Sequence, residues 1–136
     1  METEFDVQVI DTCFDPNQPP SAGAKPKVYV KVVDGKPLYK VWLYLTGRDL
    51  PYVESVTYKL HPELFPPERT VYRELTNPNC QYIIWTPGFF PIHTIIRDKS
   101  GRIYEAVHEM MYGKELNPDL IEYERVEDES RFMRTR

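Results

Sequence analysis

The chain has 136 residues, 41% of them apolar and 28% charged, a balance typical of one globular domain with a single core. Its 21 acidic and 17 basic side chains give a net charge of −4, which opposes binding to the phosphates of nucleic acid. No apolar run approaches the roughly 18 residues of a membrane span, and the acidic N-terminus lacks the features of a signal peptide, so we expect a cytoplasmic protein.

The first third of the chain predicts three strands and a loop. Residues 5–10 alternate apolar and polar side chains, which is the period of a half-buried strand, and we expect this strand at a sheet edge. Residues 15–26 are rich in Pro and small residues and predict a loop. Strands at 27–33 and 37–45 flank an Asp-Gly dipeptide that suits positive φ, so this pair predicts a β-hairpin.

Further strands follow at intervals of about 8 to 12 residues, separated by turn-forming residues. They are predicted at 52–60, 81–85, 89–97 and 102–111, the last two forming another hairpin. The Pro-rich segment 61–79 predicts a structured loop with room for one short strand. This succession predicts an all-β fold, an antiparallel β-sandwich of about seven or eight strands.

Composition divides the chain into three parts. We expect an edge strand and a Pro-rich loop at 1–26, a β-sandwich at 27–113 and a charged C-terminal tail at 114–136. The pattern of the tail is compatible with a short amphipathic helix, a docking strand or a disordered segment.

Residues suited to catalysis are few and have no motif spacing. The chain has no nucleophile elbow, Walker loop or zinc-protease signature, and Cys13 and Cys80 are too far apart to form a thiol pair of the CxxC type. A weaker alternative is a small metal enzyme in which His93 and His108 face each other across the last hairpin. No spacing supplies the third ligand that such a site needs. We therefore predict no catalytic residue, no metal and no cofactor.

Two predicted loops carry aromatic and small residues that a rigid sheet could present to a partner. They are Leu-His-Pro-Glu-Leu-Phe-Pro-Pro at 60–67 and Trp-Thr-Pro-Gly-Phe-Phe at 85–90. In this order, over about residues 38–112, the chain resembles the YEATS family, in particular its prokaryotic branch. The positions that carry the resemblance are Val56, Tyr58, Leu60, His61, Phe65, Trp85, Gly88 and Phe89.

The resemblance implies an immunoglobulin-like sandwich and, by analogy with eukaryotic members, recognition of acetylated or crotonylated lysine between aromatic side chains. The candidate ligand-binding residues are His61, Glu63, Leu64, Phe65, Trp85, Thr86, Gly88 and Phe89. The aromatic wall would consist of Trp85 with either Phe65 or Leu64. The Ser that the family places before Phe falls here on Glu63 or Leu64, and neither has a hydroxyl. Gly88 is expected to supply positive φ in its turn.

Two functions follow as expectations. The first is a non-enzymatic YEATS-like interaction module that binds a protein or peptide, with an acylated lysine as the candidate ligand. The alternative is a structural, sensor or adaptor domain of a prokaryotic signalling or defence system. Such a domain would make contacts through its sheet edges or its tail and would not bind acyl-lysine.

Overall fold

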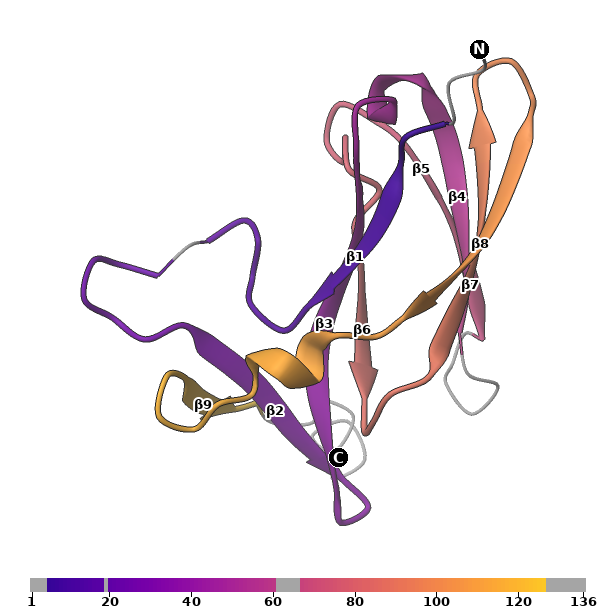
Figure 1. Ribbon diagram of the computed structural model, residues 1–136. Coiled ribbons are helices and arrows are strands. Elements are labelled where there is room, and N and C mark those ends of the chain that lie inside the picture. Colours follow the sequence, from indigo (N-terminus) through magenta and orange to yellow (C-terminus); the bar gives the residue numbers. More distant parts are fainter. Residues whose placement is uncertain (1–4, 19, 61–66, 127–136) are drawn as a thin grey trace, which may run out of the picture.

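The computed structural model describes residues 5–18, 20–60 and 67–126, and these form two β-sheets packed face to face (Figure 1). The fold is an immunoglobulin-like β-sandwich, which confirms the predicted all-β class. Nine strands lie within the described residues: β1 (Gln8–Thr12), β2 (Lys27–Val33), β3 (Lys36–Thr46), β4 (Val53–Lys59), β5 (Glu68–Tyr72), β6 (Tyr82–Thr86), β7 (Pro91–Asp98), β8 (Ile103–Glu109) and β9 (Glu122–Arg125).

Two short 3-10 helices complete the described structure, η1 (Leu50–Tyr52) and η2 (Tyr112–Glu115). Neither has the length or the apolar character that a membrane-crossing helix requires, and no other helix occurs among the described residues. Each strand predicted with its bounds is present, although β1 begins three residues later than the predicted 5–10 and ends two residues later. β5 is the short strand for which the Pro-rich segment had room, and β9 comes from the charged tail.

The five-stranded sheet is organised around β3. β6 pairs with Tyr39–Leu43 of β3 in antiparallel register. β1 pairs with the C-terminal half of β3 and β2 with its N-terminal end, and both overlap the segment that faces β6. β1 and β2 must therefore follow one another along the opposite edge of β3, and the Pro-rich loop protrudes between them (Figure 1). β9 extends the sheet by pairing with β2 in parallel.

The four-stranded sheet has the order β5-β4-β7-β8, with every neighbouring pair antiparallel. Its inner face meets the inner face of the five-stranded sheet, and period-two alternation places one side chain of every two in the core. The fully buried core includes Val41, Leu43, Leu45, Val56, Tyr58 and Ile92. The Tyr58 hydroxyl donates a hydrogen bond of 2.7 Å to the carbonyl of Cys80, so this buried phenol is satisfied.

The segment after β8 docks against β1 through two carboxylates. Asp11 of β1 accepts hydrogen bonds from the backbone N–H groups of Met111 and Tyr112. Glu115 of η2 in turn accepts hydrogen bonds from the backbone N–H of Cys13, at 2.8 Å, and from the Thr12 hydroxyl, at 2.7 Å. Of the three structures compatible with the tail pattern, the described residues show the docking strand, as β9 paired with β2, while η2 is a short 3-10 helix rather than an amphipathic α-helix.

The two histidines of the β7–β8 hairpin do not face each other, so the shared metal site considered from the sequence is wrong. His93 pairs with Val107, whereas His108 pairs with Ile92, and this register places the two imidazoles on opposite faces of the sheet. His108 points inward, where its Nε2 lies 2.6 Å from the Asp11 carboxylate. The described residues contain no group of three metal-ligating side chains.

Candidate functional site

The two candidate loops leave the sandwich at the same end. Lys59, the last residue of β4, pairs with His93 near the start of β7, so the 60–67 loop leaves its sheet beside the segment that follows β6. The Leu60 N–H donates a hydrogen bond of 2.6 Å to the Pro67 carbonyl and closes the base of this loop. The predicted ligand-binding residues His61, Glu63, Leu64 and Phe65 lie outside the described residues.

The turn from β6 to β7 is held by the buried hydroxyl of Thr86. This hydroxyl donates to the Gly88 carbonyl at 2.9 Å and accepts from the Gly88 N–H at 3.3 Å. The expectation that Gly88 supplies positive φ is wrong, because its φ lies outside that region and a Cβ built there meets no atom within 4 Å. The side chain of Thr86, rather than the freedom of glycine, shapes this turn.

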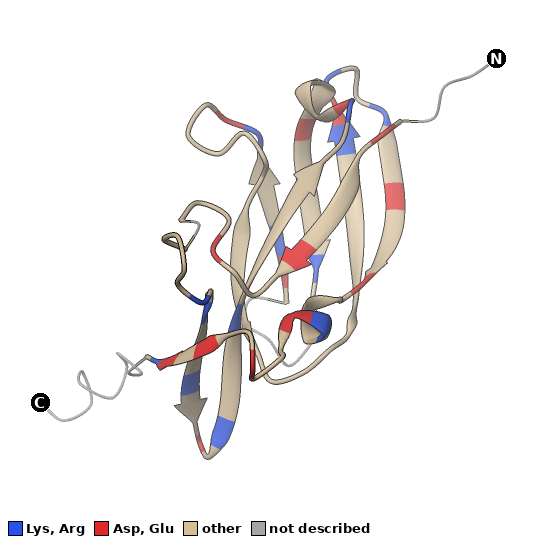
Figure 2. Ribbon diagram, turned by 60° about the vertical axis from the view of Figure 1, so that its left-hand side comes forward, with Lys and Arg blue, Asp and Glu red and all other residues tan. Residues whose placement is uncertain are grey.

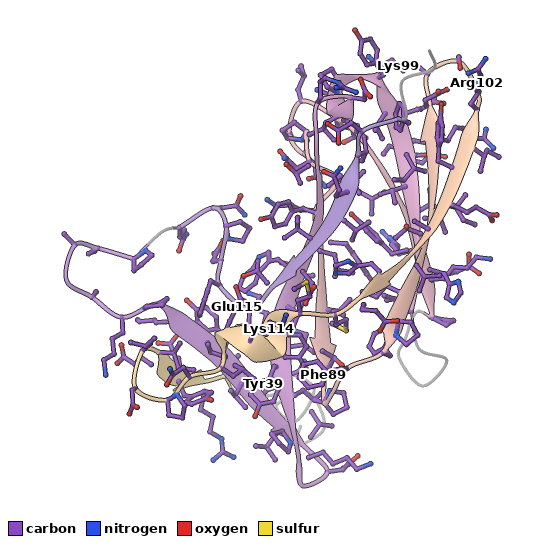
Figure 3. The ribbon with its side chains drawn as sticks, in the orientation of Figure 1. Tyr39, Phe89, Lys99, Arg102, Lys114 and Glu115 are labelled. Atoms are coloured by element: carbon purple, nitrogen blue, oxygen red, sulfur yellow. The ribbon has the colours of Figure 1, made fainter. Side chains whose placement is uncertain are left out.

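Phe89 is an exposed aromatic ring that packs on a buried one. Its side chain is 60% exposed, yet its ring centroid lies 4.7 Å from that of Tyr112, which is fully buried. The ring also lies against the backbone of Gly113, where a Cβ would be 2.5 Å from the Phe89 Cζ. Figure 3 shows Phe89 beside η2, with Tyr39 of β3 close by. Phe89 thus presents one face to solvent while a buried residue supports the other.

Tyr112 anchors this end of the sandwich. Its hydroxyl donates a hydrogen bond of 2.9 Å to the Gly88 carbonyl, and its ring centroid lies 6.3 Å from that of Tyr39. Burial, with a smaller contribution from Tyr39, raises the pKa of Tyr112 to about 12, so the phenol is a neutral donor at physiological pH. Thr86, Gly88, Phe89 and Tyr112 therefore form one connected cluster, the loop-end cluster.

Trp85 lies on a different face. Trp85 of β6 pairs with Lys40 of β3. Side chains alternate along the strand, so the Trp85 ring points to the outer side of the five-stranded sheet and the Thr86 side chain points to the inner side. The ammonium of Lys31 lies 4.5 Å from the Trp85 ring centroid and that of Lys40 lies 6.0 Å away. The described structure therefore brings Thr86, Gly88 and Phe89 together and places Trp85 beside two lysines.

Sequence reasoning missed two residues at this site, Tyr112 of the loop-end cluster and Gly113, whose backbone lies against the Phe89 ring. They follow β8 directly before the charged tail, 23 or more residues after Phe89 in the chain. The available signal was a Tyr-Gly pair directly after a predicted strand, which suits a tight docked turn. That signal marks a turn but does not indicate which loop it supports.

Comparison with known families finds a match for the middle of the chain. A family model described as the prokaryotic YEATS domain matches residues 39–110, which is more than half of the chain. The matched segment runs from within β3 to just beyond β8, so it contains both candidate loops but neither β1 nor η2. No curated protein matches the chain.

Proposed function

The chain belongs to the prokaryotic YEATS domain family, and from this premise we propose that it is a non-enzymatic interaction module that binds a peptide at the loop-end cluster. The observation that carries the proposal is the position of Phe89, a ring that is 60% exposed and yet held by Tyr112 and Gly113. A rigid, exposed aromatic side chain loses little conformational entropy when a ligand packs against it.

The ligand we propose is a peptide with an acylated lysine. Acylation replaces the charged ammonium by a flat, neutral amide, which an aromatic face can cover without the cost of desolvating a charge. The Gly88 carbonyl accepts hydrogen bonds from Thr86 and Tyr112, so both of its lone pairs are engaged. The Gly88 N–H makes one long hydrogen bond of 3.3 Å and is the donor that we propose for the acyl oxygen.

Calorimetric titration with matched peptides carrying acetyl-lysine, crotonyl-lysine or unmodified lysine tests this function. We expect an acylated peptide to bind more tightly than its unmodified form, and Phe89→Ala to weaken that binding by about tenfold or more. Tyr72→Ala is the matched control, because Tyr72 is 58% exposed on β5 and makes no contact with the loop-end cluster. Equal binding of acylated and unmodified peptides would contradict the proposal.

A second variant tests whether the position of the Phe89 ring matters when the ring itself is retained. Gly113→Ala keeps Phe89 but places a Cβ against its ring, which must move. We expect weaker binding of the acylated peptide with the sandwich still folded, as judged by far-ultraviolet circular dichroism. Unchanged affinity in Gly113→Ala would show that the supported position of Phe89 has no role in binding.

A further inference from the structure

β6 is an edge strand of the five-stranded sheet, and no other described strand pairs with its outer edge. Within the described residues it pairs with β3 alone, and none of Tyr82–Thr86 makes a backbone hydrogen bond on its other side. Natural edge strands are usually blunted by charged residues, Pro or a covering segment. β6 carries no charge and no Pro, and Ile83 on its outer face is 43% exposed. Its free backbone groups can therefore pair with another extended chain.

Two lysines lie over the aromatic ring at the end of this edge. The Lys31 and Lys40 ammonium groups lie 4.5 Å and 6.0 Å from the Trp85 ring centroid, and Lys40 also lies 4.9 Å from that of Trp42. Neither lysine forms an ion pair with a described residue. Figure 2 shows the basic residues on β2 and β3, while acidic residues mark β9. Lys40 belongs to β3 and Lys31 to β2, so cation–π contacts hold two uncompensated positive charges at the Trp85 ring, on the outer face of the sheet, where a long acidic side chain of an added strand meets them across that ring.

We propose that the β6 edge binds an extended acidic peptide segment of another protein as an added strand. Backbone hydrogen bonds to Tyr82–Thr86 would supply affinity, and alternate side chains on the outer face would supply specificity. On that face an apolar side chain of the partner meets the exposed Ile83, and an acidic one meets the lysines at Trp85. This surface uses the backbone of β6 and the outer face at Ile83 and Trp85 and does not use the Phe89 ring, so the inference goes beyond the proposed function and does not depend on it.

Other occupants fit these features less well. Single-stranded nucleic acid binds by stacking bases on open aromatic faces, whereas the Trp85 ring already carries an ammonium group. Nucleic acid would also leave the free backbone groups of β6 without partners. A second copy of this chain, paired edge to edge, would bring two sets of Lys31 and Lys40 toward each other and repel. An acidic peptide satisfies both the backbone groups and the charges.

The test uses the full chain and a blocked peptide, Thr-Glu-Thr-Val-Thr-Glu-Thr, which presents the same pattern in either strand direction. We expect saturable binding in a nitrogen-15 NMR titration, with the largest shift changes at the amides of Tyr82–Thr86. The double variant Lys31→Glu/Lys40→Glu should weaken binding about tenfold or more. The matched control Lys99→Glu/Lys114→Glu changes the same charge at exposed residues away from β6 (Figure 3) and should leave the affinity unchanged.

Backbone pairing is tested with two N-methylated peptides of the same sequence, one methylated at the Glu and Val positions and one at the inner Thr positions. In each strand direction only one set of amides faces β6, and antiparallel pairing is the more stable of the two directions, so we expect one methylated peptide to bind more weakly than the other. Equal binding of the two would overturn the inference. Absence of binding by the unmethylated peptide would also overturn it.

Two further outcomes bear on the choice of occupant. If an oligo-thymidine strand binds more tightly than the acidic peptide, the inference is overturned in favour of nucleic acid. If sedimentation shows a dimer that Ile83→Lys dissociates, it is overturned in favour of a second copy of the chain. Phe89→Ala should leave binding of the acidic peptide unchanged. That variant therefore separates a failure at the β6 edge from a failure at the loop-end cluster.

Discussion

The Asp11 carboxylate on β1 lies 2.6 Å from Nε2 of His108 on β8, although 97 residues separate them in the chain. β1 belongs to the five-stranded sheet and β8 to the four-stranded sheet, so this contact joins the two layers. The same carboxylate accepts the backbone N–H of Tyr112, whose ring supports Phe89. The exposed ring of the loop-end cluster therefore depends on a residue outside the segment that matches the family.

Asp11→Ala should destabilise the protein by about 3 kcal/mol, because it leaves the half-buried His108 imidazole, the Met111 N–H and the buried Tyr112 N–H without their acceptor. Urea unfolding monitored by circular dichroism measures this change. The control is Asp119→Ala, which removes an exposed carboxylate from the C-terminal segment. Its free energy of unfolding should stay within about 0.5 kcal/mol of the wild-type value. Equal stability of the two variants would contradict the role assigned to Asp11.

Asp98 should make the β7–β8 hairpin sensitive to acid. Its Oδ1 accepts hydrogen bonds from the N–H and hydroxyl of Ser100 and from the Arg102 N–H, and its Oδ2 accepts one from the Tyr104 hydroxyl. The Ser100 hydroxyl contributes most to lowering the pKa of Asp98 below its ordinary value. A lowered pKa means that the stabilisation is complete above about pH 4 and is lost as pH falls through the folded-state value.

Asp98→Asn should therefore lower the urea midpoint at pH 7, and the difference from the wild type should shrink at pH 3. Asp119→Asn is the control and should shift the midpoint at neither pH. A difference between Asp98→Asn and the wild type that is as large at pH 3 as at pH 7 would show that the carboxylate charge is not what stabilises the hairpin.

Both thiols should react slowly in the folded protein. Burial, followed by the charge of Glu115, raises the pKa of Cys13, and burial raises the pKa of Cys80 to about 11. At pH 8 neither thiol is then appreciably ionised, and the thiolate is the reactive form. Iodoacetamide labelling followed by mass spectrometry should be slow until urea is added. Glu115→Ala should speed the labelling of Cys13 and leave Cys80, which does not contact Glu115, unchanged.

Two glycine substitutions should differ sharply in their effect on stability. Gly47 has φ +136° and a Cβ there would overlap the backbone of Asp6 and Val7, so Gly47→Ala should destabilise the protein by about 2 kcal/mol or more. Gly88→Ala should be neutral or slightly stabilising, because the position has ordinary φ and open space. Thermal unfolding of the two variants measures this difference, and similar melting temperatures would contradict the described turns.

Local sequence patterns predicted most of the strands. The hairpin of β2 and β3 was visible because an Asp-Gly dipeptide joins two runs of period-two alternation, and Asp34 and Gly35 do adopt positive φ. β7 and β8 were visible for the same reason. These signals depend only on residues that are close together in the chain, so they can be read from a single sequence without tertiary information.

Long-range pairing was not visible. β9 pairs in parallel with β2 although about 90 residues lie between them, and its sequence has too little alternation to mark a strand. The support of Phe89 by Tyr112 joins residues 23 apart in the chain, and the docking of η2 on Asp11 joins residues 101 apart. Such contacts follow from how two sheets pack, which no local propensity specifies.

By itself the sequence determined the all-β class, the positions of most strands and the resemblance to a family, because alternation, turn residues and motif order are local properties of the chain. The tertiary structure alone decided which candidate residues meet. It separated Trp85 from Phe89, because adjacent strand positions face opposite sides and a turn redirects the chain between them. It also placed Lys31 of β2 and Lys40 of β3 at the Trp85 ring of β6, since cross-strand register brings together residues that sequence spacing keeps apart.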